Sequence, residues 1–185
     1  TKLAAWELTH RQVMVLIEQF GNSAVNVIEE NPYQLIGVLS NFGFKRVDQI
    51  AMRMGISKEL PARIRAGIIW VLEQEAQSEG HTWIDYAEGI EKINLLLIMD
   101  CLDSIEKIDR ELQWLIENDD IVLTGITPIM EDIMGENIKI GVQAKLALKS
   151  LYDQEQFIIQ TLTDRSLQTE RDFSAILPSA SGLPA

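Results

Sequence analysis

Cysteine and long apolar runs are both scarce in this sequence of 185 residues. Its single cysteine, Cys101, cannot form an internal disulfide or a cysteine-based metal site, so nothing indicates an oxidising compartment. The longest apolar run, residues 93–99 with Asn94 inside it, is far shorter than the roughly 20 residues that a membrane span requires. The first residues also lack the basic and then apolar pattern of a signal peptide. We therefore expect a folded cytoplasmic protein without a membrane partner.

The groups that most enzymes need are missing as well. The two histidines, His10 and His81, stand far apart, and neither belongs to an H-x-x-x-H pattern, so we expect no metal site. No G-x-x-x-x-G-K-[ST] loop occurs, and no glycine is followed by lysine, so no motif could hold the phosphates of ATP. We expect no catalytic residue and no cofactor in this chain. Because it begins with Thr and ends in a loose stretch over 174–185, we expect it to be part of a longer protein.

Positive charge is in deficit, and the deficit is uneven. The chain has 16 Lys and Arg against 28 Asp and Glu, a net charge of -12, which argues against nucleic acid as a partner. Residues 1–80 carry 8 basic and 9 acidic residues, net -1, whereas residues 81–185 carry 8 and 19, net -11. Within residues 45–65 there are 6 basic and 2 acidic residues, net +4. Such a patch is more often a solvated helix face than a binding site, so its neighbours decide its meaning.

Apolar residues recur at helical spacing through the first part of the chain. Thr9 precedes the first apolar stripe as a candidate N-cap, and Gly21 and Gly55 follow two of the stripes as candidate stops. Pro32 can occupy the first turn of a helix, and it disfavours a helical backbone in the residue before it. The pattern predicts helices over about residues 9–20, 23–30, 32–39 and 44–54.

The last two of these helices, joined by residues 40–43, are predicted to form a helix-hairpin-helix. Such a turn, together with the first turn of its second helix, presents unpaired backbone N–H groups at the positive end of a helix dipole, where a phosphate can bind. Close approach requires small or permissive residues, which Gly43 provides and Asn41 tolerates, while Phe42 is predicted to point inward. The alternative is an ordinary corner between two helices, capped by glycine.

The candidate DNA-binding residues follow from this hairpin and from the basic segment around it. Lys45 and Arg46 lie in the first turn of the second helix, beside the expected phosphate. The other basic residues of the segment come later in the chain. The full predicted set is Asn41, Phe42, Gly43, Phe44, Lys45, Arg46, Arg53, Arg63 and Arg65.

Five blocks of this sequence, taken together, resemble the helix-hairpin-helix region of RecD-like superfamily 1 DNA helicases, and the related segment of TraA-type conjugative relaxase-helicases is similar. The likeness runs from about residue 8 to 84, with Asn41 where the family prefers a first hairpin glycine and Val47 where it has a small residue. The blocks are Glu30–Leu35, Asn41–Ala51, Gly55–Ile56, Arg63–Gly67 and Glu79–Thr82.

The resemblance implies that the intact protein is an ATP-dependent helicase that moves along single-stranded DNA, with a role in DNA repair, recombination or conjugation. ATP and Mg²⁺ would then belong to motor domains that are absent from this chain. The motor domains of the same polypeptide are an implied partner, and residues 174–185 would lie near the start of the first of them.

The second part of the chain is predicted to be a small acidic α+β segment. A strand over 82–84, helices over 86–99 and 104–117, and a hairpin of 121–124 with 137–142 follow the order of a winged helix. In a DNA-binding winged helix the second helix enters the major groove, but here that helix carries Glu106, Asp109, Glu111 and Glu117. Like charge would repel phosphates, so a structural role or a protein partner is favoured.

The predicted fold class is therefore mainly α, a helix-hairpin-helix bundle followed by a winged-helix-like α+β segment. The predicted domains are 1–80, 81–148, a helical connector over 149–173 and a flexible tail over 174–185. Two functions remain open. One is a non-catalytic accessory region that binds the DNA backbone without sequence specificity. The other is an interaction module that braces the motor or docks a partner on residues 81–148.

Overall fold

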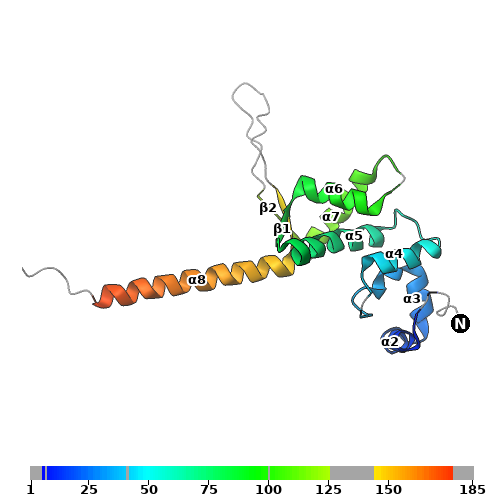
Figure 1. The fold of residues 1–185 in the computed structure, drawn as a ribbon, viewed down its shortest axis with the longest axis horizontal. Coiled ribbons are helices and arrows are strands. Elements are labelled where there is room, and N and C mark those ends of the chain that lie inside the picture. Colours follow the sequence, from blue (N-terminus) through cyan, green and yellow to red (C-terminus); the bar gives the residue numbers. More distant parts are fainter. Residues whose placement is uncertain (1–5, 7, 41, 100, 126–143, 177–185) are drawn as a thin grey trace, which may run out of the picture.

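The computed structural model describes residues 6, 8–40, 42–99, 101–125 and 144–176, and in that part it confirms the predicted fold class. Helices dominate, and three short strands form one antiparallel sheet (Figure 1). The first part of the chain contains α2 (His10–Phe20), η1 (Gly21–Ser23), α3 (Ala24–Glu30), η2 (Pro32–Leu35), α4 (Phe44–Arg53), α5 (Pro61–Gln74) and η3 (Glu75–Glu79). The second part contains β1 (Trp83–Asp85), α6 (Tyr86–Leu97), α7 (Ser104–Glu117), β2 (Ile121–Thr124), β3 (Lys145–Leu148) and α8 (Lys149–Ile176).

The first helix begins and ends where its sequence predicts. Thr9 Oγ1 accepts a hydrogen bond from the Gln12 amide at 3.4 Å, and the Gln12 side chain accepts one from the Thr9 amide at 2.9 Å. This reciprocal capping satisfies two amides that the helix itself leaves unpaired. At the other end, Gly21 has φ 60°, a left-handed conformation that glycine adopts without steric cost.

The predicted third helix, over 32–39, is wrong in its second half. Pro32–Leu35 forms a single 3-10 turn, and residues 36–40 continue as turns without helical structure. Gly37 accounts for the difference, since its φ of 83° belongs to the left-handed region and interrupts any right-handed helix. The hairpin before α4 is therefore longer than the sequence pattern indicates.

Three polar side chains join η2, α4 and α5 inside the bundle. Arg63, which is 3% exposed, donates from Nε to Asp48 Oδ1 at 2.7 Å and from Nη2 to Oδ2 at 3.0 Å. The Tyr33 hydroxyl donates to the same carboxylate. Arg63 also donates from Nη1 to the Lys58 carbonyl at 3.0 Å, so this charged group has hydrogen-bond partners on every side. A charge buried this deeply is tolerated only when it is paired in this way.

Helix α5 lies at the centre of the molecule and contacts both parts of the chain. One side packs against η2 and α4, and the other against α6, α7 and β3. Gly67 allows α6 to approach closely, because a Cβ at this position would lie 2.7 Å from Leu97 Cδ2. The buried apolar residues of both parts consequently form one continuous cluster.

The sheet has the order β1–β3–β2, with β3 in the middle. In β2 the register pairs Ile121 with Leu148 and Thr124 with Lys145, while in β1 Trp83 pairs with Ala147. The predicted partner of β2, residues 137–142, lies outside the described residues, and β3 takes that place in the described part. In the described part, the order β1, α6, α7, β2, β3 is the order of strand, helix, helix and two strands that the sequence predicts for the small α+β segment.

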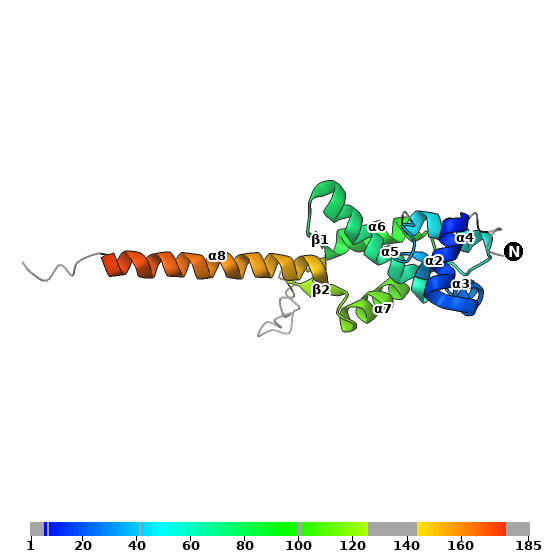
Figure 2. The same ribbon diagram turned by 90° about the horizontal axis from the view of Figure 1, so that it is seen from below.

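The predicted connector is a single long helix. Helix α8 contacts β2 and β3 near its start and then extends away from the rest of the molecule in both views (Figures 1 and 2). It runs through Ile176, beyond the predicted end at 173, whereas residues 177–185 lie outside the described residues. No described helix combines the length and the apolar character needed to cross a membrane.

Candidate nucleic-acid interface

The hairpin ends at Gly43, which is exposed and is the N-cap of α4. Its carbonyl accepts hydrogen bonds from the Arg46 and Val47 amides, each at 3.2 Å. The amides of Phe44 and Lys45 precede any intrahelical acceptor, as at every helix N-terminus. They therefore point outward at the positive end of the α4 dipole, where an anion is stabilised.

Two exposed cations flank this helix start, and aromatic rings hold both of them. Arg46 lies with its guanidinium carbon 4.2 Å from the centre of the Phe42 ring. Lys45 Nζ lies 4.8 Å from the centre of a Trp70 ring. Phe42 itself is 3% exposed, which confirms that it points inward. Cation–π contacts fix the positions of both side chains while leaving their charges exposed to solvent.

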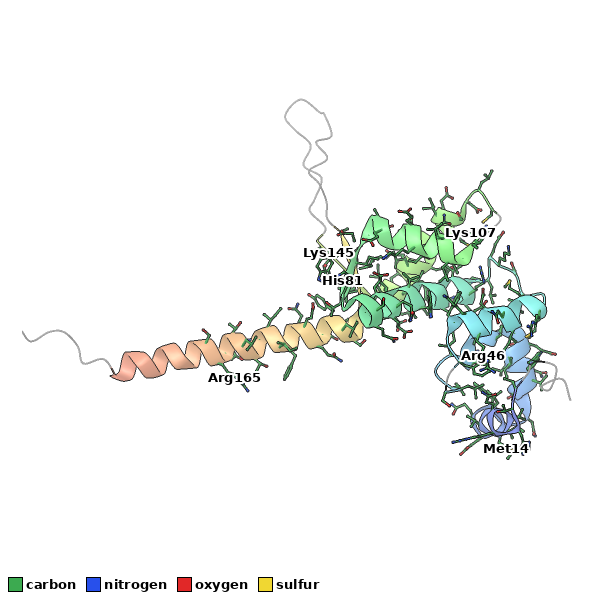
Figure 3. The ribbon with its side chains drawn as sticks, in the orientation of Figure 1. Met14, Arg46, His81, Lys107, Lys145 and Arg165 are labelled. Atoms are coloured by element: carbon green, nitrogen blue, oxygen red, sulfur yellow. The ribbon has the colours of Figure 1, made fainter. Side chains whose placement is uncertain are left out.

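Two hollows border Arg46, one on each side. The first, of about 420 Å³, is lined by Trp6, Lys45, Arg46, Gln49, Ile50 and Arg53. The second, of about 610 Å³, is lined by Thr9, Arg11, Gln12, Val15, Gly37, Val38, Leu39, Ser40 and Arg46. We call the four cations of these hollows, Arg11, Lys45, Arg46 and Arg53, the Arg46 surface. Figure 3 shows Arg46 between α4 and α2.

Arg11 is a member of this surface that the sequence does not predict. It lies in α2, more than thirty residues before Arg46, and it joins the hollow only because α2 packs beside the turn at residues 37–40. No motif links the two positions in the sequence. The sequence of α2 alone places Arg11 on the polar face of the helix and does not indicate a contact with the hairpin.

Three of the predicted DNA-binding residues are placed away from this surface. Phe44 is 2% exposed and lies between Tyr33 and Trp70, with ring centres 6.0 and 6.1 Å away. Arg63 is buried in its ion pair with Asp48. Both residues serve packing in this structure.

Arg65, the third, is half-buried and links two helices. Its Nε lies 2.9 Å from Glu111 Oε2, and its guanidinium carbon lies 3.8 Å from the centre of a Trp114 ring. It therefore links α5 to α7. Asn41 lies outside the described residues. Of the predicted set, Lys45, Arg46 and Arg53 line one hollow, and Arg46 also lies against Phe42.

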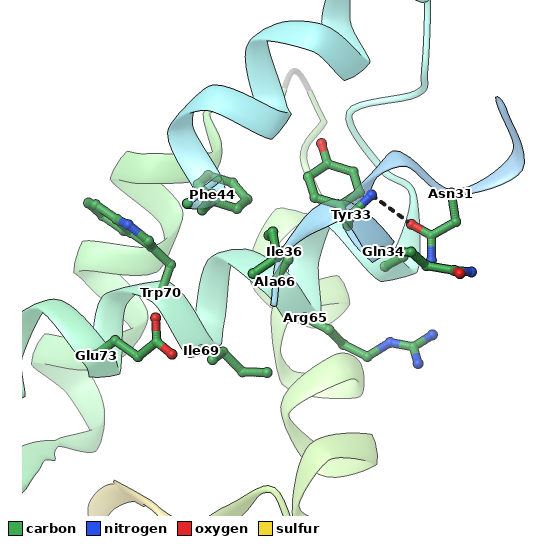
Figure 4. Close-up of a pocket in the computed structure, with 12 residues that line it drawn as sticks. Asn31, Tyr33, Gln34, Ile36, Phe44, Arg65, Ala66, Ile69, Trp70 and Glu73 are labelled. Carbon is green, nitrogen blue, oxygen red and sulfur yellow. Dashed lines mark hydrogen bonds between the residues drawn. The ribbon is translucent and has the colours of Figure 1, made fainter. Parts of the chain in front are cut away.

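An apolar cleft of about 330 Å³ opens on the other side of Gly43 (Figure 4). We call it the Gly43 cleft. Burial raises the pKa of the Glu73 carboxyl at one end of it. The cleft is lined by Asn31, Tyr33, Gln34, Ile36, Gly43, Phe44, Ala62, Arg65, Ala66, Ile69, Trp70 and Glu73.

In the second part of the chain, the charged side chains of α7 are mainly acidic, and two of them have partners inside the fold. On α7, Asp109 accepts a hydrogen bond from the Tyr86 hydroxyl at 2.6 Å, and Glu111 is 7% exposed beside Arg65. Burial, followed by the hydrogen bond to Asp109, raises the pKa of Tyr86 to about 12. Asp109 and Glu111 thus support the fold, whereas Glu106 and Glu117 are exposed. Among the described residues, no group of His, Cys, Asp and Glu is arranged to hold a metal ion.

Comparison with known protein families gives a match over the first part of the chain. Residues 1–83 match the family described as the ATP-dependent RecD2 DNA helicase HHH domain. The match spans α2 to η3 and ends at the first residue of β1. It confirms, over that range, the resemblance to the helix-hairpin-helix region of RecD-like helicases.

Proposed function

We propose, from the RecD2-type helix-hairpin-helix region over residues 1–83, that this chain is a non-catalytic accessory part of an ATP-dependent DNA helicase. In this proposal the Arg46 surface holds the phosphate backbone of DNA. The observation that supports it is the position of Lys45 and Arg46. Both are exposed beside the outward-pointing amides of α4, at the residue where the hairpin ends.

Backbone binding of this kind carries no sequence information. Amides and guanidinium groups that contact phosphates fix the position of a protein on DNA, but they do not read base edges. The net charge of -12, nearly all of it on residues 81–185, opposes binding to the rest of the molecule. Affinity is therefore expected to be weak, indifferent to sequence and strongly dependent on salt.

The test is a salt titration of DNA binding by fluorescence anisotropy. Replacing both Lys45 and Arg46 by alanine should flatten the slope of log affinity against log salt by up to about 2, because each phosphate contact contributes roughly 0.7–0.9. Arg110→Ala/Lys149→Ala changes the net charge equally at positions far from the Arg46 surface, and it should leave the slope unchanged. Equal slopes for the two double variants would identify the hairpin as a structural corner.

The proposal assigns ATP and Mg²⁺ to motor domains elsewhere in the parent polypeptide. Phosphoryl transfer requires positioned cations and a loop that cradles the phosphates, and the sequence offers no such motif. No cofactor is assigned to this chain. DNA and the motor domains of the same polypeptide are its proposed partners.

A second candidate function is protein interaction, and α8 favours it. Phe157, Ile158, Ile159 and Leu162 are between 55% and 72% exposed on the part of α8 beyond the sheet. An apolar group of this size on a protruding helix is typical of a surface that another protein covers. In this role α8 would brace the motor domains, and residues 81–148 would offer an acidic face to a partner.

A further inference from the structure

The Gly43 cleft and the Arg46 surface meet at the start of α4. Gly43 lines the cleft, and it is also the N-cap whose helix presents the proposed phosphate site. Trp70 lines the cleft, and Lys45 Nζ lies 4.8 Å from its ring. A DNA strand whose phosphate sits at the α4 amides therefore has the mouth of an apolar cleft directly beside it.

The walls of the cleft have the chemistry that a nucleobase requires. The aliphatic side chains of Ile36 and Ile69 and the aromatic ring of Trp70 offer apolar surface for the flat faces of a base. Polar groups border this apolar surface at opposite ends of the cleft: the Glu73 carboxylate lies beside Ile69 and Trp70, and the Gln34 amide lies near Asn31 (Figure 4). Each can meet a donor or an acceptor on a base edge. A largely apolar cleft of this volume with a few polar groups is typical of a site for a small flat ligand.

We propose that the Gly43 cleft receives one unpaired nucleobase of a DNA strand whose backbone is held by the Arg46 surface. This inference rests on the proposed function. It adds a preference for single-stranded over duplex DNA, since a paired base is stacked inside the double helix and cannot enter the cleft. The combination of a cationic path for the backbone with an aromatic wall for a base is the general plan of proteins that bind single strands.

The test compares three ligands at one salt concentration: a 15-mer of deoxythymidine, the same backbone with abasic residues, and a duplex of equal length. The chain should bind the thymidine strand at least about five-fold more tightly than the abasic strand, in line with the stacking of one base. Ala66→Leu fills the cleft from α5 and should abolish this difference. Ala87→Leu, at an exposed position of α6 far from the cleft, is the matched control and should preserve it.

A second measurement does not depend on the folding of the filled variant. Stacking of a base against Trp70 should quench part of the tryptophan fluorescence when the thymidine strand is added, and Trp70→Phe should remove that part. Both the quench and the affinity difference are expected. If the abasic and thymidine strands bind equally and no quench occurs, the nucleobase proposal is overturned.

The results also distinguish failure of this proposal from failure of the proposed function on which it rests. Equal binding of both strands that still depends on Lys45 and Arg46 would retain backbone binding and reject the base site. Absence of DNA binding by any ligand would reject both proposals. In either of these results the cleft is open to a different occupant, such as an apolar side chain of a protein partner.

Discussion

Asp48 accepts hydrogen bonds from two side chains that lie fifteen residues before and fifteen residues after it, Tyr33 and Arg63. These three residues belong to the blocks that resemble RecD-like helicases. Their positions show that part of this resemblance concerns packing. Asp48 joins η2 to α5, and Gly67, in the same blocks, lets α6 approach α5 closely. A basic residue in a family motif can therefore be a structural residue, as Arg63 is.

We predict that Arg63→Ala destabilises the fold without altering the salt dependence of DNA binding. Truncation leaves the partly buried carboxylate of Asp48 without its main partner, which costs up to about 3–5 kcal/mol. Urea unfolding measures this loss, and the anisotropy titration measures the slope. A variant of full stability with a flattened slope would instead place Arg63 on the DNA.

We predict that the free energy of unfolding falls as the pH rises above about 10. Burial, followed by the hydrogen bond to Asp48, raises the pKa of Tyr33, and the pKa of Tyr86 is raised to about 12. A phenol whose pKa is higher in the folded state than in the unfolded state, where it is about 10, stabilises the fold fully below pH 10. That stabilisation is lost as the pH rises through the folded value.

Urea unfolding at pH 8 and pH 11 tests this prediction. Tyr33→Phe should show a smaller loss between the two pH values than the unsubstituted chain, because one of the two phenols can no longer ionise. Tyr152→Phe, on α8, serves as the control for removal of a hydroxyl. A loss in Tyr33→Phe as large as in the unsubstituted chain would contradict the assignment.

At the scale of elements, apolar periodicity predicts most helices well. The segments at α2, α3 and α4 are found within about two residues of their predicted bounds, and α7 spans the predicted residues. The errors have local causes. Gly37 ends the predicted third helix early, and α6 stops at Leu97 because Ile98 adopts φ 42°, a conformation that no pattern of apolar residues announces.

Strand β3, which the sequence analysis does not predict, shows a second limit of reading structure from local sequence. Residues 145–148 read K-L-A-L, which has little of the β-branched or aromatic content that marks a strand. They form the central strand because β1 and β2 pair with them on either side. Long-range pairing of this kind overrides local preference.

The position of Arg11 cannot be predicted from the sequence for the same reason. Only the packing of α2 brings Arg11 close to Arg46.

We predict that the apolar residues of α8 contribute little to the stability of this chain. Ile158→Gln/Leu162→Gln should change the free energy of unfolding by less than about 1 kcal/mol, because both side chains are more than half exposed. Ile68→Ala on α5, at a position that is 0% exposed, should cost about 2–5 kcal/mol. Urea unfolding of both variants is the measurement, and a core-like loss in the α8 variant would show that this face is covered in solution.

At the scale of the whole molecule, the negative charge and the proposed DNA-binding surface lie in different parts of the chain. Residues 1–80 are nearly neutral and contain the Arg46 surface, whereas residues 81–185 carry a net charge of -11. Helix α5 connects the two parts through one core. An acidic body of this kind repels DNA from its own surface, which favours approach to the hairpin end of the molecule.

We predict that the purified chain neither binds ATP nor hydrolyses it, with or without DNA. The sequence contains no phosphate-binding loop of the kind that ATP-dependent motors use. Equilibrium binding of a fluorescent ATP analogue and release of phosphate in the presence of Mg²⁺ are the measurements. Magnesium-dependent turnover that follows the chain through every purification step would contradict the prediction.

The extension of α8 has a mechanical consequence. At a rise of 1.5 Å per residue, its 28 residues place Ile176 about 42 Å from Lys149 along the helix axis. Among the described residues, α8 contacts β2 and β3, and Thr82 donates a hydrogen bond to Glu155 in its second turn, so packing at this base orients the helix. A rotation of about 10° at that base would move the far end by about 7 Å. A small rotation of α8 at the sheet would therefore displace its far end by more than the rise of one helical turn, about 5.4 Å, so α8 has the geometry of a lever arm.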